Sequence, residues 1–362
     1  MNISHHLKIH YKSGDGITTV VRELAPLQDK FFSDVSIFPY NTDDAIACGR
    51  EFKYKGMVCN IWKILTSKNN QKTINIIHGV FSIPAIVILM ILKAKRQIVC
   101  VVPHASLIRD SWNKNRIKKK TYYSLILGPA LRFADEILFL NEEEKSKSIF
   151  PVLTKWSVHT NGVLQERIKR NPKDCLVKNI VYIGRYDVYH KGLDILIEQY
   201  RHYLDRCEER GVTPVTLELY GTGSKGKKEV GSLLKKFKLT NSVYLGDGLY
   251  DDEKESKLTE SLAFLLPSRY EGVPMALLEA MAHGCIPIVS ENTNLSSLIT
   301  KYKCGWIFGG EKSLSEAINE YSAASLKELQ MMSGRAIRAI YEQHNWNHIV
   351  SNQYDYFKKQ YN

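Results

Sequence analysis

The residues whose spacing most clearly suggests chemistry are two glutamates, Glu271 and Glu279. The continuously apolar run 262–266 before them predicts a buried parallel strand, which Pro267 ends. Glu271 then falls in the turn after this strand, and Glu279 lies two turns further along the face of the next helix. The pattern therefore aims two carboxylates at one cleft, although a bare pair with this spacing also fits two ordinary solvated helix carboxylates.

The start of the helix after Glu271 is suited to an anion. Pro274 can occupy the first helical turn, where its missing N–H group costs nothing. The free amides of Val273, Met275 and Ala276 would then point out of the helix N-terminus. Because the helix dipole adds positive charge there, a polyoxyanion would be stabilised at this position.

A second candidate is a pair of cations between a strand and a helix. Residues 180–184 predict the strand, and Arg185 and Lys191 follow it in the pattern G-R-x5-K-G. An arginine can hold a diphosphate through two parallel hydrogen bonds, while a lysine adds a point charge. The two cations could thus clamp a diphosphate from two sides. The alternative is a pair of surface cations at a helix entry.

The segment EGVPMALLEAMAHGCIPIVS resembles the signature of the retaining GT-B glycosyltransferases of group 1, also called family 4. The segment that holds Arg185 and Lys191 resembles the diphosphate-binding motif of the same family. The resemblance implies that Glu279 holds the ribose hydroxyls of a sugar nucleotide and that Glu271 contacts the donor sugar. It also implies that Arg185 and Lys191 bind the leaving diphosphate.

Glycine turns complete the donor site that the resemblance implies. Residues 216–220 and 242–245 predict strands that end at Gly221 and Gly246, and the family places the nucleotide base between such turns. An NAD site is a poor interpretation, because the Gly221 turn lacks the third glycine of the dinucleotide fingerprint. Near the start of the chain, Gly16 belongs to an element that resembles the phosphate-binding first loop of the family. A plain turn is the alternative there, since Asp15 replaces a glycine.

Two histidines follow predicted strands in the first half of the chain. His78 directly follows the strand 73–77, and His104 follows the strand 97–102 after Pro103. Open α/β sheets bind ligands at the carboxyl ends of their strands, so both histidines would face a cleft. The element 103–106 resembles the family site where a histidine lies beside the reacting sugar, which gives that role to His104. A structural histidine remains the alternative, with more weight for His78.

The alternation of strands and helices predicts the α/β class, with doubly wound parallel sheets. The resemblance implies the GT-B architecture, in which two Rossmann-like domains face a cleft. In the first half we expect strands and helices over the ranges 7–11, 17–24, 34–38, 73–77, 84–92, 97–102 and 116–133.

The predicted domains follow from composition and from the resemblance. We expect an acceptor-binding domain over 1–168 and a polar linker at 169–178. A nucleotide-sugar-binding domain is expected over 179–343. Residues 344–362 are expected to form a helix that crosses back to the first domain, as in similar proteins.

The net charge of +12 lies entirely in residues 1–170. Its densest part is a basic cluster composed of Lys114, Arg116, Lys118, Lys119 and Lys120. Such a cluster suits an anionic membrane surface or a lipid-phosphate acceptor. Nucleic acid would attract the same charges, and a solvated helix face is a further alternative.

Several classes of protein are disfavoured by the sequence. The longest apolar run, 83–92, is too short to span a bilayer, and we see no secretory signal. The seven cysteines form no C-x-x-C pair, which is typical of a reduced, cytoplasmic protein. The chain also has no D-x-D element or metal-ligand cluster, so we expect neither a metal nor another cofactor.

The expected function is a retaining, metal-independent glycosyltransferase. It would move a sugar from a nucleotide sugar, expected to be UDP-linked, to a glycan or lipid-linked oligosaccharide acceptor. The family context implies surface polysaccharide synthesis, such as that of O-antigen, capsule or lipopolysaccharide, at the inner face of the cytoplasmic membrane. The residues expected to carry catalysis are Glu271, His104, Arg185 and Lys191.

Two other functions remain open at this point. A sugar-nucleotide epimerase of the same architecture would use a similar diphosphate clamp, although the context of the two glutamates disfavours it. A basic, non-enzymatic nucleic-acid-binding protein belongs to a different class. We expect no nucleic-acid partner, because no recognisable binding module is present.

Overall fold

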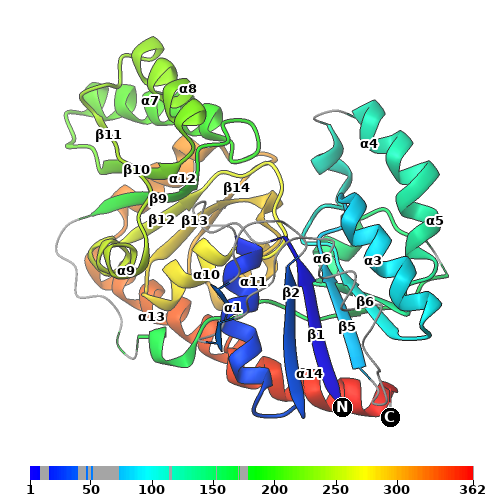
Figure 1. Ribbon diagram of the computed structural model, residues 1–362. Helices are drawn as coiled ribbons and strands as arrows, with labels where there is room; N and C mark the ends of the chain where they lie inside the picture. Colours follow the sequence, from blue (N-terminus) through cyan, green and yellow to red (C-terminus); the bar gives the residue numbers. More distant parts are fainter. Residues whose placement is uncertain are drawn as a thin grey trace. The chain divides into compact units, whose positions relative to one another are not determined.

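The chain folds into two compact units, Met1–Asn161 with Trp346–Asn362 and Gly162–Asn345. The computed structural model describes residues 1–8, 16–39, 46–47, 50–51, 73–113, 116–151, 153–169, 171 and 178–361 (Figure 1). The units divide before the predicted end of the first domain at residue 168. Backbone hydrogen bonds explain the difference, since the Val163 amide donates to His344 and the Lys169 amide donates to Ala282. Most of the predicted linker 169–178 lies outside the described residues.

The first unit is built on a six-stranded parallel sheet with the order β2-β1-β5-β6-β7-β8. Its strands are β1 (Asn2–Leu7), β2 (Asp34–Pro39), β5 (Thr73–His78), β6 (Ile98–Val102), β7 (Glu136–Phe139) and β8 (Trp156–Val158). A separate two-stranded pair joins β3 (Ile46–Ala47) to β4 (Arg50–Glu51). The prediction of a first strand at 7–11 was wrong, because β1 already begins at Asn2 and ends at Leu7.

The helices of the first unit accompany a sheet in which β5 and β7 are buried over their whole length. They are α1 (Gly16–Gln28), α3 (Ile83–Ala94), α4 (Arg116–Tyr122), α5 (Gly128–Leu131) and α6 (Glu142–Lys147). A π-helical turn, Tyr123–Leu127, joins α4 to α5, so the predicted helix 116–133 is present as three consecutive segments. Burial of Ile88 and Leu89 of α3 against Val99 of β6 forms the centre of one core cluster.

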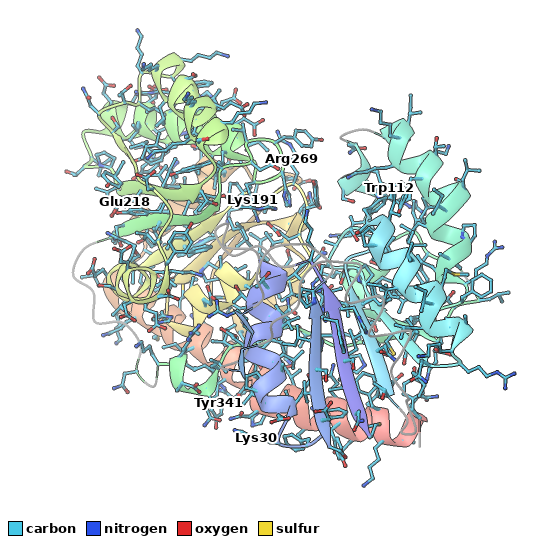
Figure 2. The ribbon with its side chains drawn as sticks, in the orientation of Figure 1. Lys30, Trp112, Lys191, Glu218, Arg269 and Tyr341 are labelled. Atoms are coloured by element: carbon cyan, nitrogen blue, oxygen red, sulfur yellow. The ribbon has the colours of Figure 1, made fainter. Side chains whose placement is uncertain are left out.

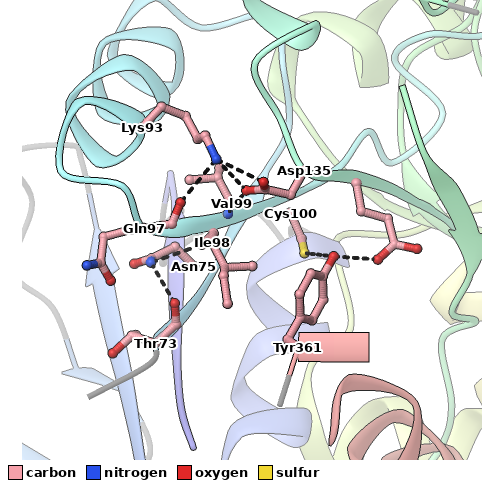
Figure 3. Close-up of polar contacts among 10 residues, drawn as sticks. Thr73, Asn75, Lys93, Gln97, Ile98, Val99, Cys100, Asp135 and Tyr361 are labelled. Carbon is pink, nitrogen blue, oxygen red and sulfur yellow. Dashed lines mark hydrogen bonds and ion pairs between the residues drawn. The ribbon is translucent and has the colours of Figure 1, made fainter. Parts of the chain in front are cut away.

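Two polar contacts fasten elements to this sheet. Lys93 of α3 forms an ion pair with Asp135 at 2.7 Å, and the Asp135 carboxylate also accepts the Val99 amide at 2.7 Å (Figure 3). At the end of the last helix, the Tyr361 hydroxyl lies 3.7 Å from the sulfur of Cys100 in β6 (Figure 3). The C-terminal ends of α3 and of the last helix are therefore both held to this sheet.

The last helix, α14 (Trp346–Tyr361), is part of the first unit and packs on α1 (Figure 1). The Trp346 indole N–H donates to Glu23 of α1 at 2.9 Å. Glu136 of β7 is fully buried and accepts hydrogen bonds from the Tyr356 and Tyr361 hydroxyls. These contacts make α14 an integral element of the first unit.

The second unit contains another six-stranded parallel sheet, with the order β11-β10-β9-β12-β13-β14. Its strands are β9 (Asn179–Arg185), β10 (Thr216–Thr222), β11 (Val243–Leu245), β12 (Ala263–Leu266), β13 (Ile286–Ser290) and β14 (Trp306–Phe308). Its helices are α7 (Leu193–Arg210), α8 (Ser224–Lys236), α9 (Asp251–Glu260), α10 (Met275–Ala282), α11 (Ser296–Tyr302), α12 (Leu314–Ala323) and α13 (Leu326–Gln343). Both sheets reverse direction of winding about a central strand, so the predicted α/β class with two doubly wound parallel sheets is confirmed.

Two further expectations concern the membrane and the cysteines. Among the described residues, no helix is long and apolar enough to cross a bilayer. Cys100, Cys207, Cys285 and Cys304 are buried free thiols, and the other three cysteines lie outside the described residues.

Candidate functional site

The candidate site of the second unit is built by two loops at the carboxyl ends of neighbouring strands. One loop follows β9 and leads to α7, and the other follows β12 and leads to α10. Gly192 lies at the contact between them, with a φ of +62°. A Cβ atom at this position would be 2.0 Å from the Pro267 carbonyl oxygen. Only glycine lets the first loop approach the second this closely.

Lys191 and Glu271 form an ion pair between these two loops. Their side chains are only 13% and 10% exposed. The Ser268 hydroxyl donates to the same Glu271 oxygen, Oε1, at 2.7 Å, and the Asn294 amide donates to the Glu271 carbonyl at 2.5 Å. Within the described part of the chain both hydrogen bonds to the Glu271 carboxylate go to Oε1.

The charge state of Glu271 follows from its surroundings. Burial, the largest single effect, would raise the pKa of this carboxyl group, but the Lys191 and His190 charges and the hydrogen bonds from Lys191 and Ser268 together outweigh it, and the pKa is lowered. Glu271 is therefore ionised at neutral pH. In contrast, burial lowers the pKa of the neighbouring His190, which stacks on Tyr270 with ring centroids 4.2 Å apart.

A second ion pair, not foreseen from the sequence, braces the same loops. Arg269 is labelled in Figure 2. Its guanidinium donates two hydrogen bonds to the Asp194 carboxylate, at 2.7 and 2.8 Å, and a third to the Tyr189 carbonyl at 2.7 Å. Asp194 lies in the first turn of α7, and Arg269 lies just before Glu271. Each residue lies two positions outside one of the two motifs, and their pairing is a tertiary contact that spacing does not reveal.

Arg185 ends β9 with an exposed side chain. Its charge acts on both His190 and Tyr270, which places it close to the two loops. The structure therefore gathers Arg185, Lys191 and Glu271 at one edge of the sheet.

The helix α10 begins at Met275, one residue after Pro274, which was expected to lie in the first turn. Pro274 is extended and precedes the helix, rather than lying in its first turn, and the Leu277 amide donates to the Pro274 carbonyl at 3.1 Å. Met275 and Ala276 are thus the first helical residues, whose amides have no acceptor within the helix. Val273 and Met275 are buried, and Ala276 is half-buried.

Glu279 lies in the second turn of α10 and is buried. It forms an ion pair with Lys254 of α9, a residue that sequence reasoning missed. Glu271 and Glu279 therefore contact different lysines.

The two glycine turns are shaped by contacts within the protein. A Cβ atom at Gly221 would be 2.3 Å from the Gly184 carbonyl oxygen, and one at Gly246 would be 2.6 Å from the Tyr220 ring. The Tyr186 hydroxyl lies between the strands and donates to the Gly246 carbonyl at 2.8 Å. These glycines are required by packing, whatever ligand the turns contact.

His104 lies in the first unit, whereas Glu271 and its partners lie in the second. It follows β6 with a φ of +50°, and Ala105 has a φ of +62°. The buried Glu144 carboxylate holds this turn by accepting the Ala105 amide at 2.5 Å and the Leu140 amide at 2.7 Å. Burial raises the pKa of Glu144 to about 7.

The remaining predicted site residues of the first unit are Gly16 and the basic cluster. Gly16 is the first residue of α1, and a Cβ atom there would meet nothing within 4 Å, while Asp15 lies outside the described residues. Arg116, Lys118 and Lys120 of α4 are exposed. Lys119 differs, because its ammonium group donates to the Ser111 carbonyl at 2.5 Å. Lys114 lies outside the described residues.

No group of three or more His, Cys, Asp or Glu side chains that could hold a metal ion occurs among the described residues. The arrangement of the second unit instead offers two cations, a helix N-terminus and two buried carboxylates. Such a combination can bind an anionic ligand that also carries hydroxyl groups.

The two doubly wound sheets define the class of protein as GT-B. A sucrose-phosphate synthase from Thermosynechococcus elongatus has the same fold with a TM-score of 0.80, 15% identity, and coverage of 100% of this chain and 99% of that one. The trehalose-6-phosphate synthase OtsA matches with a TM-score of 0.72 and 11% identity, over 99% of both chains. At these identities the likeness shows the fold alone.

The sequence family is more specific. The model of the family "Glycosyl transferases group 1" matches residues 165–339. The matched residues lie within the second unit, and the family is the one that the motifs around Arg185 and Glu271 resemble.

Curated relatives agree with this family. The O-antigen biosynthesis glycosyltransferase WclY of Escherichia coli is 26% identical over 306 residues, which are 81% of this chain and 80% of the relative. The putative colanic acid biosynthesis glycosyltransferase WcaL of Escherichia coli K12 is 28% identical over 172 residues, which are 45% of this chain. The match with WcaL spans only 40% of that relative's length.

Proposed function

We propose that the protein is a retaining glycosyltransferase that transfers a sugar from a nucleotide sugar, expected to be UDP-linked, to a glycan or lipid-linked acceptor. The observation that carries the proposal is the buried Lys191–Glu271 pair beside Arg185 at the carboxyl edge of the second sheet. The relatives named for O-antigen and colanic acid synthesis support a place in surface polysaccharide assembly.

The proposed donor contacts follow from the charges of the site. The lysine ammonium group has three N–H donors, so Lys191 can keep its contact with Glu271 and still donate to a phosphate. Arg185 would hold the diphosphate from the other side, near the N-terminus of α10. Glu279 would accept the ribose hydroxyls, and Oε2 of Glu271 would accept a hydroxyl of the donor sugar.

The proposed chemical step needs stabilisation of the leaving group more than a strong base. The bond between the anomeric carbon and the diphosphate oxygen breaks, and the negative charge that develops is offset by Arg185, Lys191 and the helix dipole. The acceptor oxygen bonds to the same face of the sugar, and its proton passes to the leaving phosphate. With these cations in place we propose that the transfer requires no metal ion.

The basic cluster supports a peripheral contact with an anionic membrane surface at the cytoplasmic side. Exposed aliphatic residues accompany the exposed cations of α4, because Ile117 is 82% exposed and Leu125 in the next helical turn is 72% exposed. Cations attract the anionic headgroups, and aliphatic side chains can enter the boundary of the acyl chains. Nucleic-acid binding would instead favour exposed aromatic residues between the cations.

A thermal-shift panel of nucleoside diphosphates and nucleotide sugars tests the donor site. A ligand at 100 times its Kd should stabilise the parent by about 2.7 kcal/mol. Arg185→Met and Glu279→Gln should lose most of this shift. Arg201→Met removes a comparable cation whose exposed pair with Asp205 lies along α7, and it should keep the shift.

Two results would overturn the proposal. The first is a panel in which no nucleotide stabilises the parent, and the second is a shift that Arg185→Met and Glu279→Gln retain. The epimerase alternative is separated by incubating the stabilising nucleotide sugar without an acceptor. Conversion to a second nucleotide sugar would favour the epimerase, whereas transfer only when a glycan or lipid-linked acceptor is added supports the proposal.

A further inference from the structure

A continuous line of hydrogen bonds crosses the first unit and ends at His104. His104 Nε2 lies 2.9 Å from His78 Nδ1, and His78 Nε2 lies 2.9 Å from His5 Nδ1. His5 Nε2 lies 2.7 Å from Gln28 Oε1, and the Gln28 amide donates to Gln353 Oε1 at 2.7 Å. The line runs from the turn after β6 through β5, β1 and α1 to α14. We call the four residues behind His104 the relay: His78, His5, Gln28 and Gln353.

The three imidazole rings are neutral at physiological pH. His5 is fully buried and His78 is 3% exposed. Burial lowers the pKa of His5 and of His104 to about 4, and lowers the pKa of His78 well below its usual range. A neutral imidazole has one N–H donor and one lone pair, so every ring in the line must donate through one nitrogen and accept through the other.

The glutamine end of the relay sets the direction of all these hydrogen bonds. Gln28 donates to Gln353, so its oxygen faces His5 and must receive the proton of His5 Nε2. His5 Nδ1 is then a lone pair that accepts from His78 Nε2. By the same reasoning, His78 Nδ1 accepts from His104 Nε2. His104 is left with its proton on Nε2 and a lone pair on Nδ1.

We propose that the relay fixes the tautomer of His104, so that its Nδ1 serves as a hydrogen-bond acceptor for a hydroxyl group of the sugar substrate. The substrate part of this inference rests on the proposed glycosyltransferase function, whereas the tautomer part does not. His78, His5, Gln28 and Gln353 are positioning residues, since they act through His104.

Two observations separate this role from simple core packing. Buried imidazoles lose more on leaving water than aliphatic side chains do, so the buried His5 and His78 beside the half-buried His104 are a poor choice for packing alone. The backbone of His104 is also held in the left-handed region, where the Glu144 carboxylate fastens the next amide. Ring tautomer and ring position are therefore both determined by buried partners.

The opposite direction of the relay gives a distinct outcome. If both glutamine amides turned over, every ring proton would move to the other nitrogen, and His104 would present an N–H group at Nδ1. Nδ1 of His104 would then donate to a substrate hydroxyl group instead of accepting from it. The identity of the protonated nitrogen therefore decides what His104 can offer to a substrate.

Nitrogen NMR of the full chain with ¹⁵N-labelled histidine rings tests the tautomer directly. His104→Gln identifies the signals of His104 by their loss. In the parent we expect a protonated Nε2 and an unprotonated Nδ1 on His104. Gln353→Met removes the acceptor at the far end of the relay and should produce a mixture of tautomers, whereas Gln353→Glu keeps an acceptor there and should preserve the parent signals.

Adjacent residues of β1 provide a matched control. His5 and His6 are equally buried, but His6 lies on the other face of the sheet and contacts Asn75 at 3.1 Å. His5→Leu should change the His104 signals, and His6→Leu should leave them as in the parent. A protonated Nδ1 in the parent would overturn the inference. His104 signals that stay unchanged in both Gln353→Met and His5→Leu would do the same.

Transfer assays add a kinetic readout. When about half of the molecules hold the wrong tautomer, kcat of Gln353→Met should fall roughly twofold or more with little change in the donor KM, and Gln353→Glu should restore it. A confirmed tautomer without any transfer activity would refute the proposed function alone. Donor stabilisation together with an unaffected His104 would refute the relay alone.

Discussion

Arg269 and Asp194 join the turn that carries Glu271 to the first turn of α7 through two parallel hydrogen bonds of 2.7 and 2.8 Å. The loop that ends with Lys191 is held between them, because Asp194 follows Lys191 closely in the chain. The position of the Lys191 ammonium group relative to Glu271 therefore depends on a second ion pair that does not itself belong to the proposed donor contacts.

Weakening this second pair should reduce donor binding more than stability. Arg269→Lys cannot form two parallel hydrogen bonds with Asp194, so Lys191 should shift relative to Glu271. We expect donor affinity to fall roughly tenfold or more, by calorimetry, because small misplacements at a reaction centre are costly. Arg201→Lys alters the exposed pair with Asp205 and should leave the affinity unchanged. Equal donor affinities in the two variants would contradict this account.

Comparing the unfolding free energies of Gly192→Ala and Gly211→Ala should separate the cost of backbone strain from the cost of steric conflict. Gly192 and Gly211 have nearly the same φ, +62° and +64°, but a Cβ atom at Gly211 would meet nothing within 4 Å. Gly211→Ala should cost about 1–2 kcal/mol of unfolding free energy from strain alone. Gly192→Ala should cost about 1–3 kcal/mol more, because its Cβ atom conflicts with Pro267. Denaturant unfolding of the two variants measures the difference, and similar losses would argue against the close contact.

Glu271 should make the stability of the second unit sensitive to acid. Its pKa in the folded protein is lowered from 4.5, so the folded state binds fewer protons than the unfolded state as pH falls. The stabilisation is fully present above pH 4.5 and is lost as pH falls through the folded value. The stability advantage of the parent over Glu271→Gln should therefore shrink below pH 4.5. A difference that stays constant down to pH 3 would contradict the ion pair with Lys191.

Glu144 should have the opposite effect on the first unit. Its pKa is raised from 4.5 to about 7, so between these values the folded state binds more protons than the unfolded state. Its contribution to stability should fall as pH rises from 4.5 to 7. We expect the unfolding free energy of the parent, minus that of Glu144→Gln, to decrease over this range. Subtracting the variant removes the contributions of the buried histidines, and an unchanging difference would rule out the raised pKa.

Membrane contact can be measured by flotation with vesicles that contain anionic lipid. The double variant Lys118→Glu and Lys120→Glu should bind at least tenfold less, since each nearby cation contributes about 1 kcal/mol. Ile117→Ser should also weaken binding, whereas vesicles of neutral lipid should bind the parent poorly. Lys225→Glu with Lys228→Glu changes the same charge on exposed positions of α8 and should have little effect. Equal loss in both double variants would indicate nonspecific attraction.

Local pattern was sufficient for much of the fold. Strands β6 and β12 are continuous apolar runs, and α14 lies within its predicted range, because burial on both faces or on one helical stripe leaves a clear trace in the sequence. The first strand was misplaced because His5 and His6 interrupt its apolar residues, although both are buried. Helix α9 was missed because its residues are almost all polar.

The candidate site divides in the same way. Lys191 and Glu271 were found because each belongs to a motif in consecutive residues. Their brace, Arg269 with Asp194, depends on which loops become neighbours in the sheet. The hydrogen bonds of His104 likewise depend on the order of β1, β5 and β6, and strand order cannot be obtained from the spacing of residues along the chain.

The place of α14 in the first unit also sets the order in which the chain can fold during synthesis. All of the second unit leaves the ribosome before α14 does, so the second unit can close while the first is still missing an element. Until Tyr356 and Tyr361 emerge, the carboxylate of Glu136 lacks two hydroxyl donors that it has in the finished fold. A buried acceptor that lacks two of its hydrogen-bond donors opposes closure. The unit that begins first in the sequence is therefore the last to be completed.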